Sequence, residues 1–227
     1  MLNGLYVAAL TAALSFLSAA PATAAGEILI THQAALAGNI TPGDQPGYPI
    51  HLTRYGVYQL AGPLHPPAGG IGLAVTGADV TIDLNGFRIH GGGAAFHGIT
   101  GSAENVTIRN GTVAGFRFDG INVAGDYLFV MDMRIVGNGR DGIVCTYGCH
   151  IEGSLIAENF GRGIDLDQGT ILGNTIVKNG LVGINALFGG TGYGNNTLVN
   201  NSTRTAPGPE VSGGVQPLHP NVCNGCP

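Results

Sequence analysis

Hydrophobic residues in this chain occur in short segments that are separated by turn residues and recur at a nearly constant interval. The dipeptide Gly-Ile appears five times between residues 97 and 202, and its isoleucines are separated by 22, 22, 21 and 20 residues: Ile99, Ile121, Ile143, Ile164 and Ile184. A repeat of roughly 20 to 50 residues is typical of solenoids, in which each unit buries its apolar face against the next unit.

The segments between the glycines are short and rich in β-branched residues, as in Val106-Thr107-Ile108, Arg134-Ile135-Val136 and Thr175-Ile176-Val177. Such segments predict strands, and the 40 glycines with their repeated Asn-Gly pairs exclude long helices. One coil then contains two or three short strands joined by tight bends. Because successive coils stack in register, each strand pairs in parallel with its counterpart about 4.8 Å away, which predicts a parallel β-helix.

Alternation along each repeat assigns side chains to the inside or the outside of the coil. If the recurring isoleucine points inward, the residue two positions later also points inward, and none of these residues is charged: Gly101, Val123, Cys145, Leu166 and Ala186. The intervening residues point outward and are mostly polar: Thr100, Asn122, Val144, Asp165 and Asn185.

A row of asparagines accompanies the isoleucines. Asn138, Asn159, Asn179 and Asn200 recur at 21, 20 and 21 residues. We place them at bends, where asparagine tolerates a left-handed backbone and its amide can hydrogen-bond to the coils above and below. A structural ladder explains this row better than a binding site does.

Four segments are expected along the chain. Residues 1–24 have the apolar run and the small-x-small ending, Ala22-Thr23-Ala24, of a signal peptide, although no Lys or Arg precedes the apolar run. Residues 25–48 form a mobile lead-in, residues 49–202 form the β-helix with capped ends, and residues 203–227 fold back over the last coil. The prediction is a secreted, periplasmic or extracellular chain with no transmembrane segment after cleavage; an uncleaved membrane anchor is the alternative.

The runs GVYQL, VTIDLNGFRI and NVTIRNGTVAGF, with the Gly-Ile pairs that follow them, resemble bacterial secreted right-handed parallel β-helix repeat proteins of the pectin-lyase-like superfamily. The likeness covers roughly Pro49 to Ser202, and the ending NVCNGCP is also similar. It implies a single-stranded right-handed coil. Members with known roles include polysaccharide lyases, hydrolases and epimerases, alongside adhesins and phage tailspikes. The full catalytic pattern of pectate lyases, polygalacturonases or alginate epimerases is not found, so the resemblance implies a fold and no single activity.

Composition narrows the choice of partner. Only 10% of the residues are charged, the net charge is −5, and the nine Lys and Arg are scattered, so no nucleic-acid partner is expected. The 44% of hydrophobic residues argues against disorder in the repeat region. We expect a monomer that has a polysaccharide as its candidate partner.

The chain contains four cysteines: Cys145, Cys149, Cys223 and Cys226. An even number in an exported chain predicts disulfides, and of the three possible pairings the local one, Cys145–Cys149 with Cys223–Cys226, is the simplest. The inward position of Cys145 leaves open a buried thiol or a different partner. A zinc site on the second pair would need two more ligands, for which His150 and His219 are available, but the spacing matches no known zinc module and no metal site is predicted.

Residues able to carry chemistry gather two positions before each recurring isoleucine, in the column His97, Asp119, Asp141, Arg162 and Val182. Two carboxylates one coil apart lie about 5 Å apart at the backbone, with an arginine on the next coil. The candidate catalytic residues are Asp119, Asp141, Arg162, Asp165 and Asp167, and the candidate substrate-binding residues are His97, Asn122, Arg140 and Asn185.

Two chemistries fit this patch. Paired carboxylates can act as acid and base, or as nucleophile and acid, in glycoside hydrolysis. Alternatively, carboxylates hold Ca²⁺, which neutralises a uronate while an arginine acts as the base in β-elimination. The sequence does not identify a cofactor, and Ca²⁺ is the ion that the second chemistry would require.

A structural explanation of the same residues stands beside the chemical one. Asp119-Gly120 and Asp141-Gly142 are ordinary turn dipeptides, and an Asp–Arg column along a solenoid can be a salt-bridge ladder. We therefore expect a secreted β-helix protein that binds or processes an extracellular polysaccharide, as a polysaccharide lyase or glycoside hydrolase if it is an enzyme. The alternative is a non-catalytic envelope or extracellular protein that serves as a spacer or interaction surface. Its support is that coils of 20 to 22 residues leave little chain for groove walls.

Overall fold

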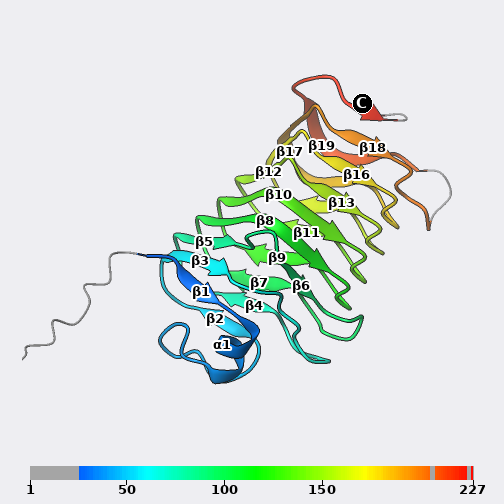
Figure 1. Ribbon diagram of the computed structural model, residues 1–227. Helices are drawn as coiled ribbons and strands as arrows, with labels where there is room; N and C mark the ends of the chain where they lie inside the picture. Colours follow the sequence, from blue (N-terminus) through cyan, green and yellow to red (C-terminus); the bar gives the residue numbers. More distant parts are fainter. Residues whose placement is uncertain (1–25, 205–207, 224–225, 227) are drawn as a thin grey trace, which may run out of the picture.

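The computed structural model describes residues 26–204, 208–223 and 226, so the predicted signal peptide lies outside the described residues. The described chain forms a right-handed parallel β-helix of about 8 turns, in which the strands of neighbouring coils lie side by side along the axis (Figure 1). Its twenty strands make one continuous sheet that is folded into three faces. The predicted fold class is confirmed.

The first face carries the Gly-Ile repeats. Its strands are β2 (Ile50–Leu52), β4 (Leu73–Val75), β7 (Ile99–Ser102), β9 (Ile121–Ala124), β11 (Ile143–Cys145), β14 (Ile164–Leu166) and the first parts of β17 (Ile184–Gly194) and β19 (Val211–Pro217). The five recurring isoleucines pair directly from coil to coil and are completely buried. The central premise of the sequence analysis is therefore correct.

The second face follows the first in each coil. Its strands are β1 (Ile28–Ile30), β3 (Gly56–Leu60), β5 (Val80–Asp83), the first parts of β8 (Val106–Ala114) and β10 (Leu128–Val136), β12 (Cys149–Glu152), β15 (Gly169–Leu172) and the second parts of β17 and β19.

The third face closes each coil. It contains β6 (Arg88–His90), the second parts of β8 and β10, β13 (Leu155–Ala157), β16 (Thr175–Val177), β18 (Thr197–Val199) and β20 (Val222–Cys223). The three faces enclose one hydrophobic core, mostly aliphatic, that runs along the solenoid.

The glycine of each Gly-Ile pair is required by the close stacking of the coils. A Cβ placed on Gly142 would lie 2.6 Å from the carbonyl oxygen of Gly163 and 2.9 Å from Nδ2 of Asn159. Real Cβ atoms do not approach other atoms so closely, so a larger residue here would push neighbouring coils apart.

The asparagine ladder exists, but two details of the prediction are wrong. Its fourth member is the buried Asn201, whereas Asn200 is exposed. The left-handed backbone belongs to the residue before each ladder position, with φ between 56° and 66°: Gly137, Glu158, Lys178 and Asn200. The left-handed residue turns the chain so that the following asparagine points inward, where its amide bonds to the next coil.

A second ladder at another bend was missed. The side chains of Ser154, Asn174, Asn196 and Asn221 accept hydrogen bonds from backbone N–H groups of the preceding coils. Its spacings of 22 and 25 residues between asparagines are less regular, and its first member is a serine, which explains why no sequence repeat revealed it.

Residues 25–48 were predicted to be a mobile lead-in, but they contain ordered elements. Strand β1 pairs with β3, and the helix α1 (His32–Ala37) follows it, with the Thr31 hydroxyl accepting a hydrogen bond from the Ala34 N–H at 2.9 Å. Ile30 and Ala35 are completely buried in the core. These elements cover the first coil because the end of a solenoid otherwise exposes its core to water.

The C-terminal segment also differs from the prediction. Instead of folding back, β19 continues the stack beside β17, and β20 continues it beside β18.

The local disulfides Cys145–Cys149 and Cys223–Cys226 are both formed. Cys145 does point inward, as alternation predicted, and is buried. The Cys145–Cys149 disulfide, which lies at the bend between the first and the second face, is therefore part of the core.

Candidate functional site

The predicted column lies on the bend between the third and the first face. The N–H groups of Gly98, Gly120 and Gly142 donate to the carbonyl oxygens of the column residues one coil further on, at 3.0 to 3.3 Å: Asp119, Asp141 and Arg162. The repeat spacing therefore places the side chains of His97, Asp119, Asp141 and Arg162 on consecutive coils.

Asp119 is held in place by the chain around it. One carboxylate oxygen accepts the backbone N–H of Asp141 at 3.2 Å, and the other accepts Nδ2 of Asn122 at 2.8 Å. Its side chain is 0% exposed. Asp119 therefore holds the backbone of Asp141 in position, and its buried carboxylate cannot contact a polymer on the surface.

Asp141, like Asp119, accepts the backbone N–H of the column residue on the next coil, but its second oxygen has a different neighbour. Its Oδ1 accepts the backbone N–H of Arg162 at 2.6 Å, while its Oδ2 lies 3.9 Å from the guanidinium of Arg162. The residue is 5% exposed, and burial raises its pKa above the usual range; the Arg162 N–H opposes this shift and the nearby Asp119 reinforces it. Asp141 is thus the carboxyl of the column that is best suited to hold a proton.

Arg162 and Asp165 form the outer part of the site. Arg162 bonds Oδ2 of Asp165 at 3.0 Å, and Nδ2 of Asn185 donates to the other oxygen of Asp165 at 2.7 Å. The Ser212 hydroxyl donates to Asn185 at 2.6 Å, so the polar contacts reach the last coil.

His97 and Arg140 lie on either side of Asp119. Nδ1 of His97 is 3.5 Å from the Asp119 carboxylate, and Nε of Arg140 is 3.7 Å from it. Burial lowers the pKa of His97, against the opposing effect of Asp119. Both residues therefore belong to the cluster, although neither makes a short hydrogen bond to the carboxylate.

One predicted residue does not join the cluster. Asp167 lies beyond the end of β14, and among the described residues its carboxylate makes no hydrogen bond or ion pair. The structure brings together the other eight predicted residues: His97, Asp119, Asn122, Arg140, Asp141, Arg162, Asp165 and Asn185.

Two shallow hollows open beside Arg162. One, of about 320 Å³, is lined by residues that include Arg140, Asp141, Phe160, Arg162 and Arg204. The other, of about 250 Å³, is lined by residues that include Arg162, Asn185 and Ser212. Because both hollows share Arg162 and Leu181, they adjoin along the stacking direction.

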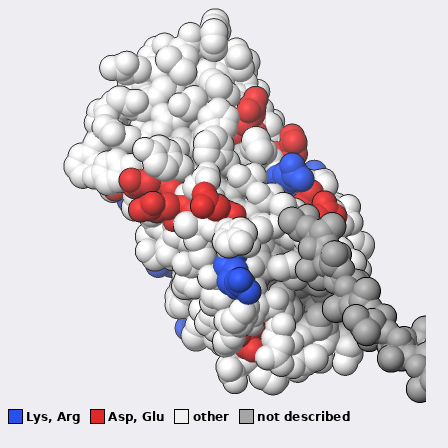
Figure 2. Space-filling model, turned by 90° about the vertical axis from the view of Figure 1, so that its left-hand side faces the viewer, with Lys and Arg blue, Asp and Glu red and all other residues white. Residues whose placement is uncertain are grey.

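Sequence reasoning missed Phe160 and Arg204. The guanidinium of Arg204 lies 3.4 Å from the centre of the Phe160 ring, which holds a cation over the first hollow. Arg204 follows the last repeat, so no periodic signal pointed to it. The hollow is therefore bordered by three arginines and one nearly buried carboxyl. On the face of the molecule seen in Figure 2, charged side chains form separate groups with uncharged surface between them.

The cluster does not fit a bound cation. The Arg162 guanidinium already occupies the space next to Asp141 and Asp165, and its charge opposes a divalent ion there. Among the described residues, no group of three or more His, Cys, Asp or Glu side chains is arranged to hold a metal. We therefore derive no step through Ca²⁺.

These features define a right-handed parallel β-helix protein with a polar site on one bend. The chain belongs to the family of right-handed β-helix regions, whose family model matches residues 67–203. Comparison with curated proteins and with solved structures gave no significant match. Within the described residues, no helix has the length and apolar character needed to cross a membrane.

Proposed function

We propose that this protein is exported and binds an acidic extracellular polysaccharide across the two hollows beside Arg162. The observation that carries the proposal is that the hollows adjoin at Arg162, with Asp141 lining one and Asn185 lining the other. A polymer laid along the stacking direction would contact both. The two disulfides are compatible with an oxidising compartment outside the cytoplasm.

The charges around the first hollow favour an anionic ligand. Asp165 is neutralised by Arg162, whereas Arg140 and Arg204 have exposed side chains. A guanidinium recognises a carboxylate through two parallel hydrogen bonds, so a uronate carboxylate suits the space between these arginines. A neutral glycan would offer no negative charge to these cations, whose present contacts are the Asp119 carboxylate, 3.7 Å from Arg140, and the Phe160 ring beneath Arg204.

The same geometry supports hydrolysis. Burial raises the pKa of Asp141, which favours its protonated form and suits it to donate a proton to a leaving oxygen. Asp165, on the other side of Arg162, supplies the second carboxyl group that glycoside hydrolysis requires. Asp119 positions Asp141 by accepting its backbone N–H.

The competing function is a non-catalytic spacer. Its support is that Asp119 and Asp141 each accept a backbone N–H from the next coil, as a purely structural ladder would. In that case the arginines would only balance the buried carboxylates.

To separate these functions, the purified protein is tested with soluble uronate polymers and with neutral polymers, in the presence and absence of Ca²⁺. Retention is read by affinity electrophoresis, and turnover by reducing ends and by the absorbance of unsaturated products. The variants are Arg140→Gln, Asp141→Asn and Asp165→Asn. The control is Glu158→Gln, which removes an exposed carboxylate from the same solenoid.

We expect retention on uronate polymers that weakens in Arg140→Gln and is unchanged in Glu158→Gln. Turnover, if the protein is a hydrolase, disappears in Asp141→Asn and Asp165→Asn while retention persists in Asp141→Asn. A folded wild-type protein that neither retains nor cleaves any polymer would overturn the proposal in favour of the spacer.

A further inference from the structure

Exposed aromatic rings gather at the bend between the first and the second face, which is not the bend of the candidate site. At this bend β9 and β11 end, and β10 and β12 begin (Figure 1). Its exposed rings are Tyr127 at 57%, Tyr147 at 45% and Phe188 at 50%. Large rings left in water close together, beside polar residues, are typical of a surface that binds another molecule.

The rings follow one another along the stacking direction. The backbone N–H of Tyr127 donates to the carbonyl oxygen of Tyr147 at 3.0 Å, so these residues lie on neighbouring coils. The rings of Tyr147 and Phe188 form a stacked pair, with planes 13° apart and centroids 6.2 Å apart. At this separation the stacking is offset, which leaves part of a face of each ring open.

The backbone around these rings holds them in place. A Cβ on Gly148 would lie 2.8 Å from Cδ1 of Tyr127, so glycine is needed to leave room for that ring. The Cys145–Cys149 disulfide closes the short loop that carries Tyr147. A ligand that binds here therefore meets a loop that is already restrained, which lowers the entropic cost of binding.

Two carboxylates accompany the rings and have no side-chain partner among the described residues. Asp126 directly precedes Tyr127. Asp167 lies on the coil between those of the stacked pair, because its N–H donates to the Thr146 carbonyl oxygen and its carbonyl oxygen accepts the Phe188 N–H, both at 3.2 Å. Asp167 is the predicted residue that the candidate site does not use, and here it lies beside two open rings.

The charge of this bend is negative. None of the segments that join the first face to the second between residues 76 and 190 contains a Lys or Arg: 76–79, 103–105, 125–127, 146–148, 167–168 and 187–190. They contain four acidic residues: Asp79, Glu104, Asp126 and Asp167. A uronate polymer would be repelled here, whereas a cation would be attracted both by the carboxylates and by the ring faces.

The other bend of the same molecule shows how such a cation binds. The guanidinium of Arg204 lies 3.4 Å from the centre of the Phe160 ring, which is 55% exposed. The rings of Tyr147 and Phe188 are exposed to a similar degree, but no cation of the described residues lies over them. A guanidinium is planar, so it can stack on a ring while its N–H groups bond a carboxylate.

We propose that this bend binds an extended, arginine-containing segment of a partner protein. One arginine stacks on the open faces of Tyr147 and Phe188 and pairs with Asp167, and a second pairs with Asp126 beside Tyr127. The segment is extended because the rings and carboxylates follow the solenoid axis over four coils. A neutral glycan could stack on the rings, but it offers no positive charge to the carboxylates. The proposal uses no residue of the polysaccharide site and does not depend on it.

The test titrates the isotope-labelled protein with a synthetic peptide of alternating arginine and serine and follows the backbone amides by NMR. A second peptide has citrulline at each arginine, which keeps the planar group and removes its charge. A neutral glucose oligosaccharide and a glucosamine oligomer are titrated separately. We expect the arginine peptide to shift the amides of residues 146–148 and 187–190, and the citrulline peptide to leave them unchanged.

Three results of these titrations would overturn the proposal. The first is an arginine peptide that shifts only amides elsewhere in the protein or none at all. The second is a citrulline peptide that binds as tightly as the arginine peptide. The third is an oligosaccharide that shifts the amides of this bend more strongly than the arginine peptide does, because the bend would then be a glycan site.

Variants test the roles of the rings and of the carboxylate. Tyr147→Ala, Phe188→Ala and Asp167→Asn should each weaken binding of the arginine peptide about two- to fivefold, as expected for one exposed cation–π contact or ion pair. The matched controls are Tyr55→Ala, which removes a 73% exposed ring beside Arg54 on the first coil, and Glu158→Gln, which removes an exposed carboxylate on another bend. Both controls should bind as the wild type does, and circular dichroism verifies that all variants are folded. An affinity that is unchanged in the three variants, or that falls equally in the controls, would mean that the peptide is attracted only by the net charge of −5 and would overturn the proposal.

Discussion

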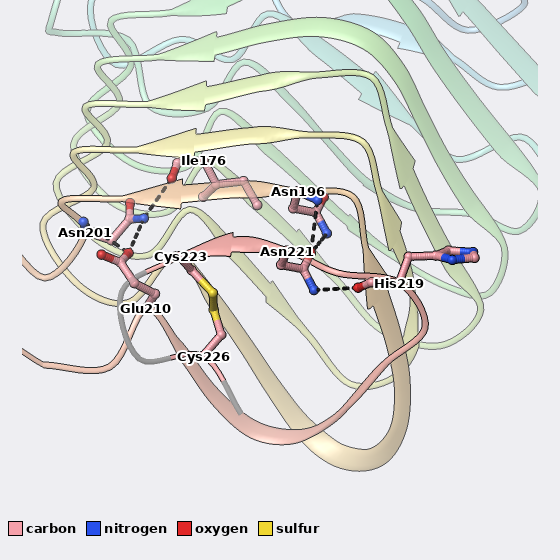
Figure 3. The surroundings of a disulfide bond; sticks show 8 residues. All are labelled: Ile176, Asn196, Asn201, Glu210, His219, Asn221, Cys223 and Cys226. Carbon is pink, nitrogen blue, oxygen red and sulfur yellow. Dashed lines mark hydrogen bonds between the residues drawn. A yellow bond between two sulfur atoms is a disulfide. The ribbon is translucent and has the colours of Figure 1, made fainter.

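Two columns of polar side chains run along this solenoid. In both, a side-chain oxygen accepts a backbone N–H from the neighbouring coil, but the result differs between the two columns. In the asparagine ladder, the side-chain oxygens of Asn159, Asn179 and Asn201 each accept the N–H and the side-chain amide of the asparagine one coil earlier, and the ladder begins at Asn138, whose oxygen accepts the N–H of Phe116. The last member donates in turn to Glu210 (Figure 3). Every rung repeats the previous one, and every member is buried.

The acidic column begins in the same way. Asp119 accepts the N–H of Asp141, and Asp141 accepts the N–H of Arg162. There the repetition ends, because Arg162 has no side-chain acceptor and its guanidinium turns to Asp165 instead. The hollows open at this position.

The comparison shows how a repeated fold separates structure from chemistry. In a column where every polar side chain is hydrogen-bonded to the neighbouring coils, no polar group is left to bind a ligand. A column whose repetition is interrupted leaves side chains that are oriented by the ladder beneath them but are not fully used by it. The candidate site lies at such an interruption.

The largest expected effect comes from interrupting the asparagine ladder. Asn159→Ala removes the acceptor for the N–H and side-chain amide of Asn138 and the donor to the carbonyl oxygen of Ile135. Each buried polar group left without a partner costs about 1–3 kcal/mol, so the free energy of unfolding should fall by about 3 kcal/mol or more. Chemical denaturation measures this loss.

Asn200→Gly is the matched control. Gly accepts the left-handed backbone of residue 200, and the exposed side chain that it removes belongs to no ladder. We expect a change within about 0.5 kcal/mol. If both variants lost the same free energy of unfolding, Asn200 would have to be a member of the ladder, and the assignment of Asn201 to the ladder would be contradicted.

Gly142→Ala tests the close stacking on which both columns depend. The new Cβ would lie 2.6 Å from the Gly163 carbonyl oxygen, and overpacking of this kind costs about 1–3 kcal/mol. Gly62→Ala is the control, since no atom lies within 4 Å of its Cβ position. Thermal or chemical unfolding should show a clear loss in the first variant only, and equal stabilities would mean that the coils can separate locally at little cost.

The fold could be predicted from the sequence because each coil repeats the same pattern of inward and outward residues. The isoleucine period fixed the inward rows, and the alternation correctly placed Val123, Cys145 and Leu166 in the core. The same period placed His97, Asp119, Asp141 and Arg162 on one bend. Periodicity identifies residues that repeat, and these residues do.

What the sequence did not reveal lacks a period. Arg204 reaches Phe160 from beyond the last repeat, and β1 and α1 close the first coil with residues unlike any repeat. The shift from Asn200 to Asn201 has a different cause. Two adjacent asparagines fit the spacing equally well, and only the backbone shows which one follows the left-handed residue.

The pH dependence of Asp141→Asn sharpens the contrast between a ladder residue and a proton-holding group. Because the folded pKa of Asp141 is raised, the folded state holds its proton more tightly than the unfolded chain does. The stability that Asp141 contributes is therefore present at low pH and is lost as the pH rises through the folded pKa. Relative to the wild type, the Asn variant should gain stability as the pH rises above about 4.

Denaturation curves of both proteins at several pH values between acidic and neutral measure this difference. A difference in unfolding free energy that is independent of pH would show that Asp141 titrates as it does in the unfolded chain. Asp141 would then be a ladder member like the asparagines, and its assignment as a general acid would be lost.

The smallest effect on stability is expected at Arg204, the residue furthest from any repeating contact. Its guanidinium stacks on Phe160, and an exposed cation–π contact contributes only about 0.5–1 kcal/mol, so Arg204→Gln should unfold nearly as the wild type does. Retention on uronate polymers should nevertheless weaken, because the variant removes one of the three cations around the first hollow. Arg134→Gln, which removes an exposed arginine of the third face, is the control for net charge and should retain the polymer as the wild type does. Equal retention by both variants would mean that the cation over Phe160 serves packing alone, and the interrupted column would then have to bind its ligand through Arg140 and Arg162.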